Sequence, residues 1–81
     1  MDWTVYILEC ADGTFYTGIT NDLPARIQAH SDGKGARYTR GRGPFSVIYT
    51  EECAGRAAAS SREVAIKRLS RAQKMTLAGR S

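Results

Sequence analysis

The sequence is poor in cysteine. Cys10 and Cys53 are the only cysteines among 81 residues, and they lie far apart in the chain. They match neither the ligand cluster of a metal site nor the dense cysteine framework of a small secreted protein. We therefore expect two reduced, partly buried thiols, with neither a disulfide nor a catalytic role.

Long apolar runs, repeats, linkers and low-complexity segments are also missing. No stretch approaches the ~20 apolar residues of a membrane span. The first residues lack the basic segment and long apolar segment of a secretory signal. We expect residues 1–81 to form one soluble cytoplasmic domain with a single modest core, and we expect a monomer.

Basic residues are absent from the start of the chain. Residues 1–22 carry four acids and no Lys or Arg, whereas residues 23–81 carry all twelve basic residues and only four acids. The first part therefore has a charge of −4 and the rest a charge of +8. This distribution suits a polyanionic partner, and nucleic acid is the default candidate, although a basic surface can also serve solubility alone.

Two segments near the N-terminus have the composition of β-strands. Residues 3–10 and 14–19 are rich in β-branched and aromatic side chains, and they flank Ala-Asp-Gly at 11–13. The pattern predicts a hairpin.

Two turns are compatible with this hairpin. A two-residue turn pairs Ala11 with Thr14, whereas a three-residue loop with a left-handed glycine pairs Cys10 with Thr14. The second register points Tyr6 and Tyr16 toward the same face, with a glycine opposite Tyr6. We favour it because it creates a site, whereas the other register scatters the two tyrosines.

A short helix is predicted over residues 22–31. Capping residues and a proline precede or open the segment, and Leu23 and Ile27 form one apolar stripe. Arg26 and His30 are also four residues apart and share a different stripe.

The remaining segments predict a loop, a strand and two helices. Residues 31–44 contain four glycines and several basic residues, which is typical of a mobile basic loop. A strand is expected over 45–50 and a helix from about residue 56. Ser70 is a candidate cap for a last short helix that ends at Leu77.

The chain resembles the GIY-YIG nucleases at five places. Thr-Val-Tyr at 4–6 and Tyr-Thr-Gly at 16–18 resemble the two motifs of that family, and Arg26, His30 and then Glu63 follow in the family's order. The resemblance covers essentially the whole chain.

Further segments refine the resemblance. Residues 34–39 and 69–74 resemble the small stand-alone bacterial branch of the family. The first motif lacks its glycine, because Thr4 occupies that position, and Thr17 stands where isoleucine is usual. The two tyrosines and Gly18 are intact, so these departures obscure the motif more than they affect the chemistry.

The resemblance implies an α+β fold, with a three-stranded antiparallel sheet flanked by about three helices. It also implies hydrolysis of phosphodiester bonds with one divalent metal, usually magnesium or manganese. By position, Tyr6 and Tyr16 are the motif tyrosines, Arg26 and His30 the helix pair, and Glu63 the metal ligand.

Phosphodiester hydrolysis requires such groups independently of the family, because water must be activated and transition-state charge neutralised. Glu63 offers an oxygen ligand to a hard cation that can keep most of its waters. Arg26 offers a planar fork to the scissile phosphate. We take Tyr6 as the favoured general base, although the pKa of its phenol, ordinarily ~10, must first be lowered. Tyr16 and His30 are assigned to orienting the water or sharing the proton transfer.

We therefore expect a low-specificity endonuclease that acts on DNA, on branched, damaged or single-stranded forms. Binding is expected to rest mostly on phosphate contacts, aided by stacking of an aromatic ring on an exposed base. The candidate nucleic-acid-binding residues are Lys34, Arg37, Tyr38, Arg40, Arg42, Lys67 and Arg71. The alternatives are a non-catalytic nucleic-acid-binding or adaptor module and a small RNA- or ribosome-associated protein.

Overall fold

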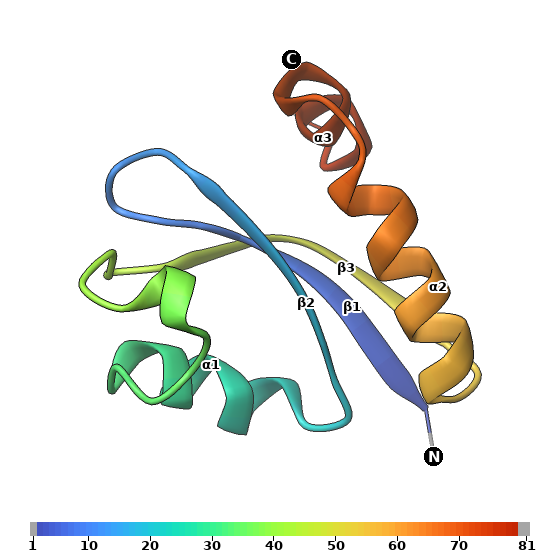
Figure 1. Cartoon of the computed structure of the whole chain (residues 1–81), viewed down its shortest axis with the longest axis horizontal. Coiled ribbons are helices and arrows are strands. Elements are labelled where there is room, and N and C mark those ends of the chain that lie inside the picture. Colours follow the sequence, from blue (N-terminus) through green and yellow to red (C-terminus); the bar gives the residue numbers. More distant parts are fainter. Residues whose placement is uncertain (1, 80–81) are drawn as a thin grey trace.

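The computed structural model describes residues 2–79 and consists of a three-stranded sheet with helices on both sides (Figure 1). This confirms the expected α+β class. The elements in chain order are β1 (Trp3–Glu9), β2 (Phe15–Thr20), α1 (Leu23–Ser31), the short 3₁₀ helix η1 (Arg37–Thr39), β3 (Ser46–Cys53), α2 (Arg56–Lys67) and α3 (Arg71–Leu77).

The sheet is antiparallel, in the order β2-β1-β3, so β2 is an edge strand. The backbone N–H of Cys10 donates to the carbonyl of Thr14 at 2.8 Å, and Gly13 has a φ of 83°. This is the three-residue loop with a left-handed glycine. The favoured register is confirmed, because Tyr6 pairs with Gly18 in the resulting ladder.

Strand β3 is longer than the sequence predicts. It continues past Thr50 to Cys53 and pairs with β1 along its whole length. Ile7 pairs with Tyr49 but Leu8 pairs with Val47, so a bulge interrupts the register. The charged pair after Thr50 concealed the end of the strand, because glutamate is depleted in strands.

The hydrophobic core lies on the side of the sheet that α2 covers. Val5 and Ile7 of β1 and Ala59 and Ile66 of α2 are all fully buried and form one cluster. Burial of each large apolar side chain contributes about 1.5–3 kcal/mol. Helix α1 lies on the opposite side of the sheet from α2 and α3 (Figure 1). The alternation along β1 therefore points Tyr6 away from this core.

Both predicted caps are present. The Asp22 carboxylate accepts a hydrogen bond from the backbone N–H of Ala25 at the start of α1, and Ser70 forms a capping box with Gln73 at the start of α3. Such caps typically contribute about 1 kcal/mol. The first cap fixes where α1 begins, and hence which of its side chains face the sheet.

The basic loop over 31–44 has more internal structure than its composition predicts. It contains η1, and Thr39 within it is only 1% exposed. The backbone N–H of Ala11 donates to the carbonyl of Arg42 at 2.7 Å, which ties the loop to the hairpin. Glycine content predicted mobility, but tertiary contacts position the middle of this loop.

The two cysteines are free thiols, as expected, and Cys10 is buried. Within residues 2–79, no helix has the length and apolar character required to cross a membrane.

Candidate functional site

The side chain of Tyr6 lies across Gly18 of the neighbouring strand. A Cβ at position 18 would lie 2.6 Å from the Tyr6 hydroxyl oxygen and 2.7 Å from its Cζ. Only the absence of a side chain at Gly18 lets the phenol extend toward the outer edge of the sheet. Glycine is thus required here by a close approach and not by an unusual backbone angle.

Tyr6 begins a hydrogen-bonded chain that leads into the basic loop. Its hydroxyl lies 2.9 Å from Nε2 of His30, and Nδ1 of His30 lies 2.8 Å from Oγ1 of Thr39. The Thr39 hydroxyl donates its one proton to the carbonyl of Ala36 at 2.8 Å. It must therefore accept from Nδ1–H of His30, which leaves Nε2 of the neutral ring as the acceptor for the Tyr6 hydroxyl.

His30 is buried and neutral in this chain. It is 1% exposed, and burial, with a smaller contribution from the Arg26 charge, lowers its pKa below the ordinary value of 6.5. Gly35 packs directly on the imidazole, because a Cβ at position 35 would lie 2.8 Å from Cγ of His30. The loop thus encloses one edge of the ring and supplies its partner.

The Arg26 guanidinium lies beside both tyrosine hydroxyls. Its interaction with the Tyr6 hydroxyl is the largest cause that raises the pKa of Arg26, and Tyr16 acts in the same direction. The Nε–H of Arg26 is buried and has no hydrogen-bond partner within residues 2–79. An unpaired buried donor costs about 1–3 kcal/mol, so a bound anion that engages this group would relieve that cost.

Tyr16 occupies the centre of an aromatic cluster. Its ring centroid lies 6.3 Å from that of Tyr6, 5.3 Å from that of His30 and 6.0 Å from that of Tyr38, on which it stacks. Tyr16 is partly exposed, whereas Tyr6 is fully buried. Of Tyr6 and Tyr16, only Tyr16 is in contact with solvent.

The burial of Tyr6 bears on the general base expected from the sequence. Desolvation raises the pKa of Tyr6 above 10.0, and the interaction with Arg26 only partly offsets this rise. Its proton is also donated to His30. The expectation that Tyr6 takes a proton directly from water conflicts with this geometry. The alternation of side chains along the strands predicted that both tyrosines share one face, but it could not predict which of them is the more buried.

Glu63 of α2 lies beside a lysine, and its charge acts on Tyr6 of the site. Its side chain is 20% exposed, and its Oε2 lies 3.6 Å from Nζ of Lys67. Its charge also contributes to the raised pKa of Tyr6. The contact with Lys67 exceeds hydrogen-bonding distance, so the carboxylate oxygens retain lone pairs for a cation. No group of three or more His, Cys, Asp or Glu side chains suited to a metal occurs within residues 2–79.

The predicted nucleic-acid-binding residues divide into free and engaged side chains. Arg71 donates to the carbonyl of Gly13 at 2.6 Å, and Arg42 pairs with Asp12, so these two fasten α3 and the basic loop to the hairpin turn. The remaining basic residues of the predicted set are exposed, and those in the basic loop have no side-chain partner within residues 2–79. These exposed residues are Lys34, Arg37, Arg40 and Lys67.

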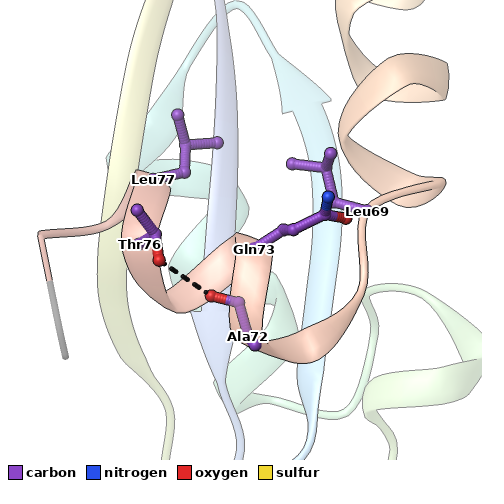
Figure 2. Close-up of a pocket in the computed structure, with 5 residues that line it drawn as sticks. All are labelled: Leu69, Ala72, Gln73, Thr76 and Leu77. Atoms are coloured by element: carbon purple, nitrogen blue, oxygen red, sulfur yellow. Dashed lines mark hydrogen bonds between the residues drawn. The ribbon is translucent and has the colours of Figure 1, made fainter.

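A separate pocket lies against α3. Figure 2 shows Leu69, Ala72, Gln73, Thr76 and Leu77 around it, with the Thr76 hydroxyl donating to the carbonyl of Ala72 at 3.1 Å. Its lining is mostly apolar and includes none of the predicted site residues. It is therefore distinct from the site on the tyrosines.

Sequence reasoning missed the residues that support the site. Thr39 and Gly35 hold His30, and Thr17 and Lys74 line a groove beside Tyr16. A glycine and a threonine in a glycine-rich loop carry no distinguishing local signal. Their roles arise only when the loop folds back onto α1.

Comparison with known proteins identifies the family. The GIY-YIG catalytic domain matches residues 2–76. UPF0213 protein DP2720 of Desulfotalea psychrophila is 57% identical over 76 residues, which cover 93% of this chain and 69% of that protein. UPF0213 protein VNG_2274C of Halobacterium salinarum is 51% identical over 73 residues, covering 90% of this chain and 95% of that protein.

Two solution NMR structures share the fold. UPF0213 protein BH0048 from Bacillus halodurans has a TM-score of 0.62 at 48% identity, covering 98% of this chain and 84% of that one. Protein EF2693 from E. faecalis has a TM-score of 0.66 at 38% identity, covering 94% and 81%. The chain therefore belongs to the GIY-YIG family of nuclease domains, among its small UPF0213 members.

Proposed function

We propose that this protein is a metal-dependent endonuclease that hydrolyses phosphodiester bonds in DNA with low sequence specificity, in repair or recombination. The observation that supports the proposal is that Arg26 lies beside the hydroxyls of Tyr6 and Tyr16, while Glu63 lies close enough for its charge to act on Tyr6. These four side chains come from a hairpin and two helices on opposite sides of the sheet. Arg26 lowers the pKa of Tyr6 through a side-chain interaction, and the charge of Glu63 raises it by a smaller amount.

Glu63 would hold the divalent cation, which is magnesium or manganese in this proposal. One carboxylate suffices, because such cations keep several waters as ligands. The bound cation would supply positive charge to the scissile phosphate. The donor chemistry of Glu63 fits this role, since its one ion-pair contact within residues 2–79, with Lys67, is long at 3.6 Å.

Arg26 would bind the scissile phosphate. Its guanidinium already lies against the hydroxyls of Tyr6 and Tyr16. The chain from Tyr6 through His30 to Thr39 fixes the direction of each hydrogen bond and leaves the Tyr6 oxygen as an acceptor toward Arg26. Tyr6 and His30 therefore position Arg26, and preorganised charge of this kind usually stabilises a transition state more than any other single effect.

Tyr16 is the better candidate to receive the proton of the attacking water. Its ring is partly exposed, whereas Tyr6 is sealed from solvent. In this step Tyr16 acts as a phenolate, after its own proton has passed to solvent. It takes a proton from the water as the water oxygen forms a bond to phosphorus, the bond from phosphorus to the leaving oxygen breaks, and solvent supplies a proton to that oxygen.

Cleavage of supercoiled, single-stranded and branched DNA tests the proposal. We expect cleavage with magnesium or manganese and none with a chelator. Arg26→Ala should lower the rate about 10²–10³-fold, whereas Arg68→Ala, at an exposed arginine that caps the end of α2, should leave it unchanged. Failure to cleave any substrate would leave a folded nucleic-acid-binding module in place of a nuclease.

A further inference from the structure

A groove lies beside Tyr16 along the outer edge of β2, and the proposed chemistry does not use it. It is bounded by the edge strand, the basic loop and helices α2 and α3. Its lining residues are Phe15, Tyr16, Thr17, Tyr38, Lys67 and Lys74. Because Tyr16 belongs to both, the groove opens directly onto the proposed catalytic site.

One wall of the groove is cationic. Lys67 makes only the 3.6 Å contact with Glu63, and Lys74 has no ion-pair partner within residues 2–79. Two ammonium groups that lack strong internal partners form an anion site across a narrow groove. Backbone phosphates of nucleic acid are the anions that such lysines contact most often.

Three residues of the lining are aromatic. Tyr38 is 43% exposed, and its ring stacks on that of Tyr16 with an interplanar angle of 25°. The Arg42 guanidinium carbon lies 4.4 Å from the Tyr38 ring centroid, so a positive charge accompanies this aromatic surface. Phe15 extends the apolar lining. Exposed aromatic rings beside a basic track are the means by which proteins bind nucleic-acid bases that are not stacked in a duplex.

Thr17 adds a polar group that lacks a partner. The residue is 3% exposed, and its Oγ1 has no hydrogen-bond partner within residues 2–79. Buried hydroxyls are almost always paired, so an unpaired one in the lining of a groove indicates a ligand atom that completes it. A sugar oxygen or phosphate oxygen supplies the complementary group.

We propose that this groove binds one unpaired nucleotide of the substrate strand, next to the phosphate held by Arg26. Lys67 and Lys74 contact its phosphate, and Tyr38 contacts its base. A base inside a duplex cannot turn onto Tyr38 while it remains paired, so the groove selects strands with at least one unpaired nucleotide. This inference rests on the proposed function and names the substrate class of that site.

Binding in a chelating buffer tests the groove without requiring cleavage. The probes are a short fluorescent homothymidine strand, an abasic strand of equal length and charge, and a duplex. We expect Tyr38→Ala to weaken binding of the homothymidine strand about fivefold or more and to leave binding of the abasic strand unchanged. Tyr38→Phe, which keeps the ring, should retain the wild-type affinity. Lys74→Ala should reduce the slope of log affinity against log salt by about 0.7 for both strands.

Arg68→Ala is the matched control, because Arg68 is an exposed cation next to Lys67 that does not line the groove. The proposal would be overturned if Tyr38→Ala weakened binding of the homothymidine and abasic strands equally, or if Lys74→Ala and Arg68→Ala had equal effects on binding. It would also be overturned if the wild type bound duplex and single strand with equal affinity. If the variants bind as expected but the protein cleaves no DNA in the presence of metal, the groove proposal stands and the nuclease proposal fails.

Discussion

The Tyr6 hydroxyl and the His30 imidazole share a 2.9 Å hydrogen bond between two buried residues that lie 24 positions apart. The bond joins the centre of the sheet to the end of α1. Its direction is set from the far side of the ring, where Thr39 accepts from Nδ1 and donates to Ala36. A loop residue outside the family motifs thus determines which atom of His30 faces the site.

Thr39→Val is expected to destabilise the fold by about 1–3 kcal/mol, because it leaves buried polar groups of His30 and Ala36 unpaired. Thr39→Ser keeps the hydroxyl and should recover most of this loss. Urea unfolding measures the free energy. Imidazole ¹⁵N shifts should show Nδ1 protonated in wild type and in the serine variant. An Nε2-protonated ring in the wild type would refute the assigned direction of the chain.

The stability should depend on the protonation of His30, the single histidine. Its folded-state pKa lies below 6.5, so around and below that pH the unfolded chain binds more protons than the folded chain does. The free energy of unfolding is then greatest above the unfolded pKa, and it falls as the pH decreases from 6.5 toward the depressed folded value.

Urea unfolding between about pH 5 and 8 checks this dependence. His30→Gln removes the titrating group and should flatten the profile in this window, whatever its effect on absolute stability. A wild-type profile that gains stability on acidification would mean that His30 is held in its charged form.

Gly18→Ala should destabilise the protein by about 1–3 kcal/mol, because the new methyl group collides with the rigid Tyr6 ring. A double-mutant cycle with Tyr6→Leu isolates the cause, since the shorter side chain does not extend over position 18. The cost of Gly18→Ala should largely disappear in that background. An unchanged cost would place its origin in the strand itself.

The two tyrosines should differ when their hydroxyls are removed. Tyr16→Phe is expected to lower the cleavage rate about 10²–10⁴-fold, the range of a lost general base, with little change in stability. Tyr6→Phe should lower stability by about 1–3 kcal/mol because His30 loses its donor. Single-turnover cleavage and urea unfolding of both variants separate the roles. The reverse pattern would return the base to Tyr6.

Local sequence signals were sufficient to predict the hairpin and the helix starts. They left two turns open, and the register with a left-handed Gly13 was favoured only because it places Tyr6 and Tyr16 on one face. Asp22 and Ser70 predicted their caps because capping depends on residues three positions away. These features are local in the chain, which is why one sequence sufficed.

The support of the site depends on contacts that no local pattern encodes. Thr39 reaches His30 only because the loop folds back over α1, and Gly35 is required only because His30 lies against it. The difference in burial between Tyr6 and Tyr16 likewise depends on the covering loop and helix. Periodicity assigned these side chains to a face, whereas tertiary packing determined their chemistry.

The rate of DNA cleavage by Glu63→Gln, relative to wild type at saturating metal, tests the central claim most directly. Glu52→Gln is the matched control, because Glu52 is an exposed glutamate of β3, whereas Glu63 belongs to α2. We predict a loss of about a hundredfold or more for Glu63→Gln, with unchanged stability, and no loss for the control. Equal rates for the two variants would contradict a metal-dependent nuclease built on Glu63.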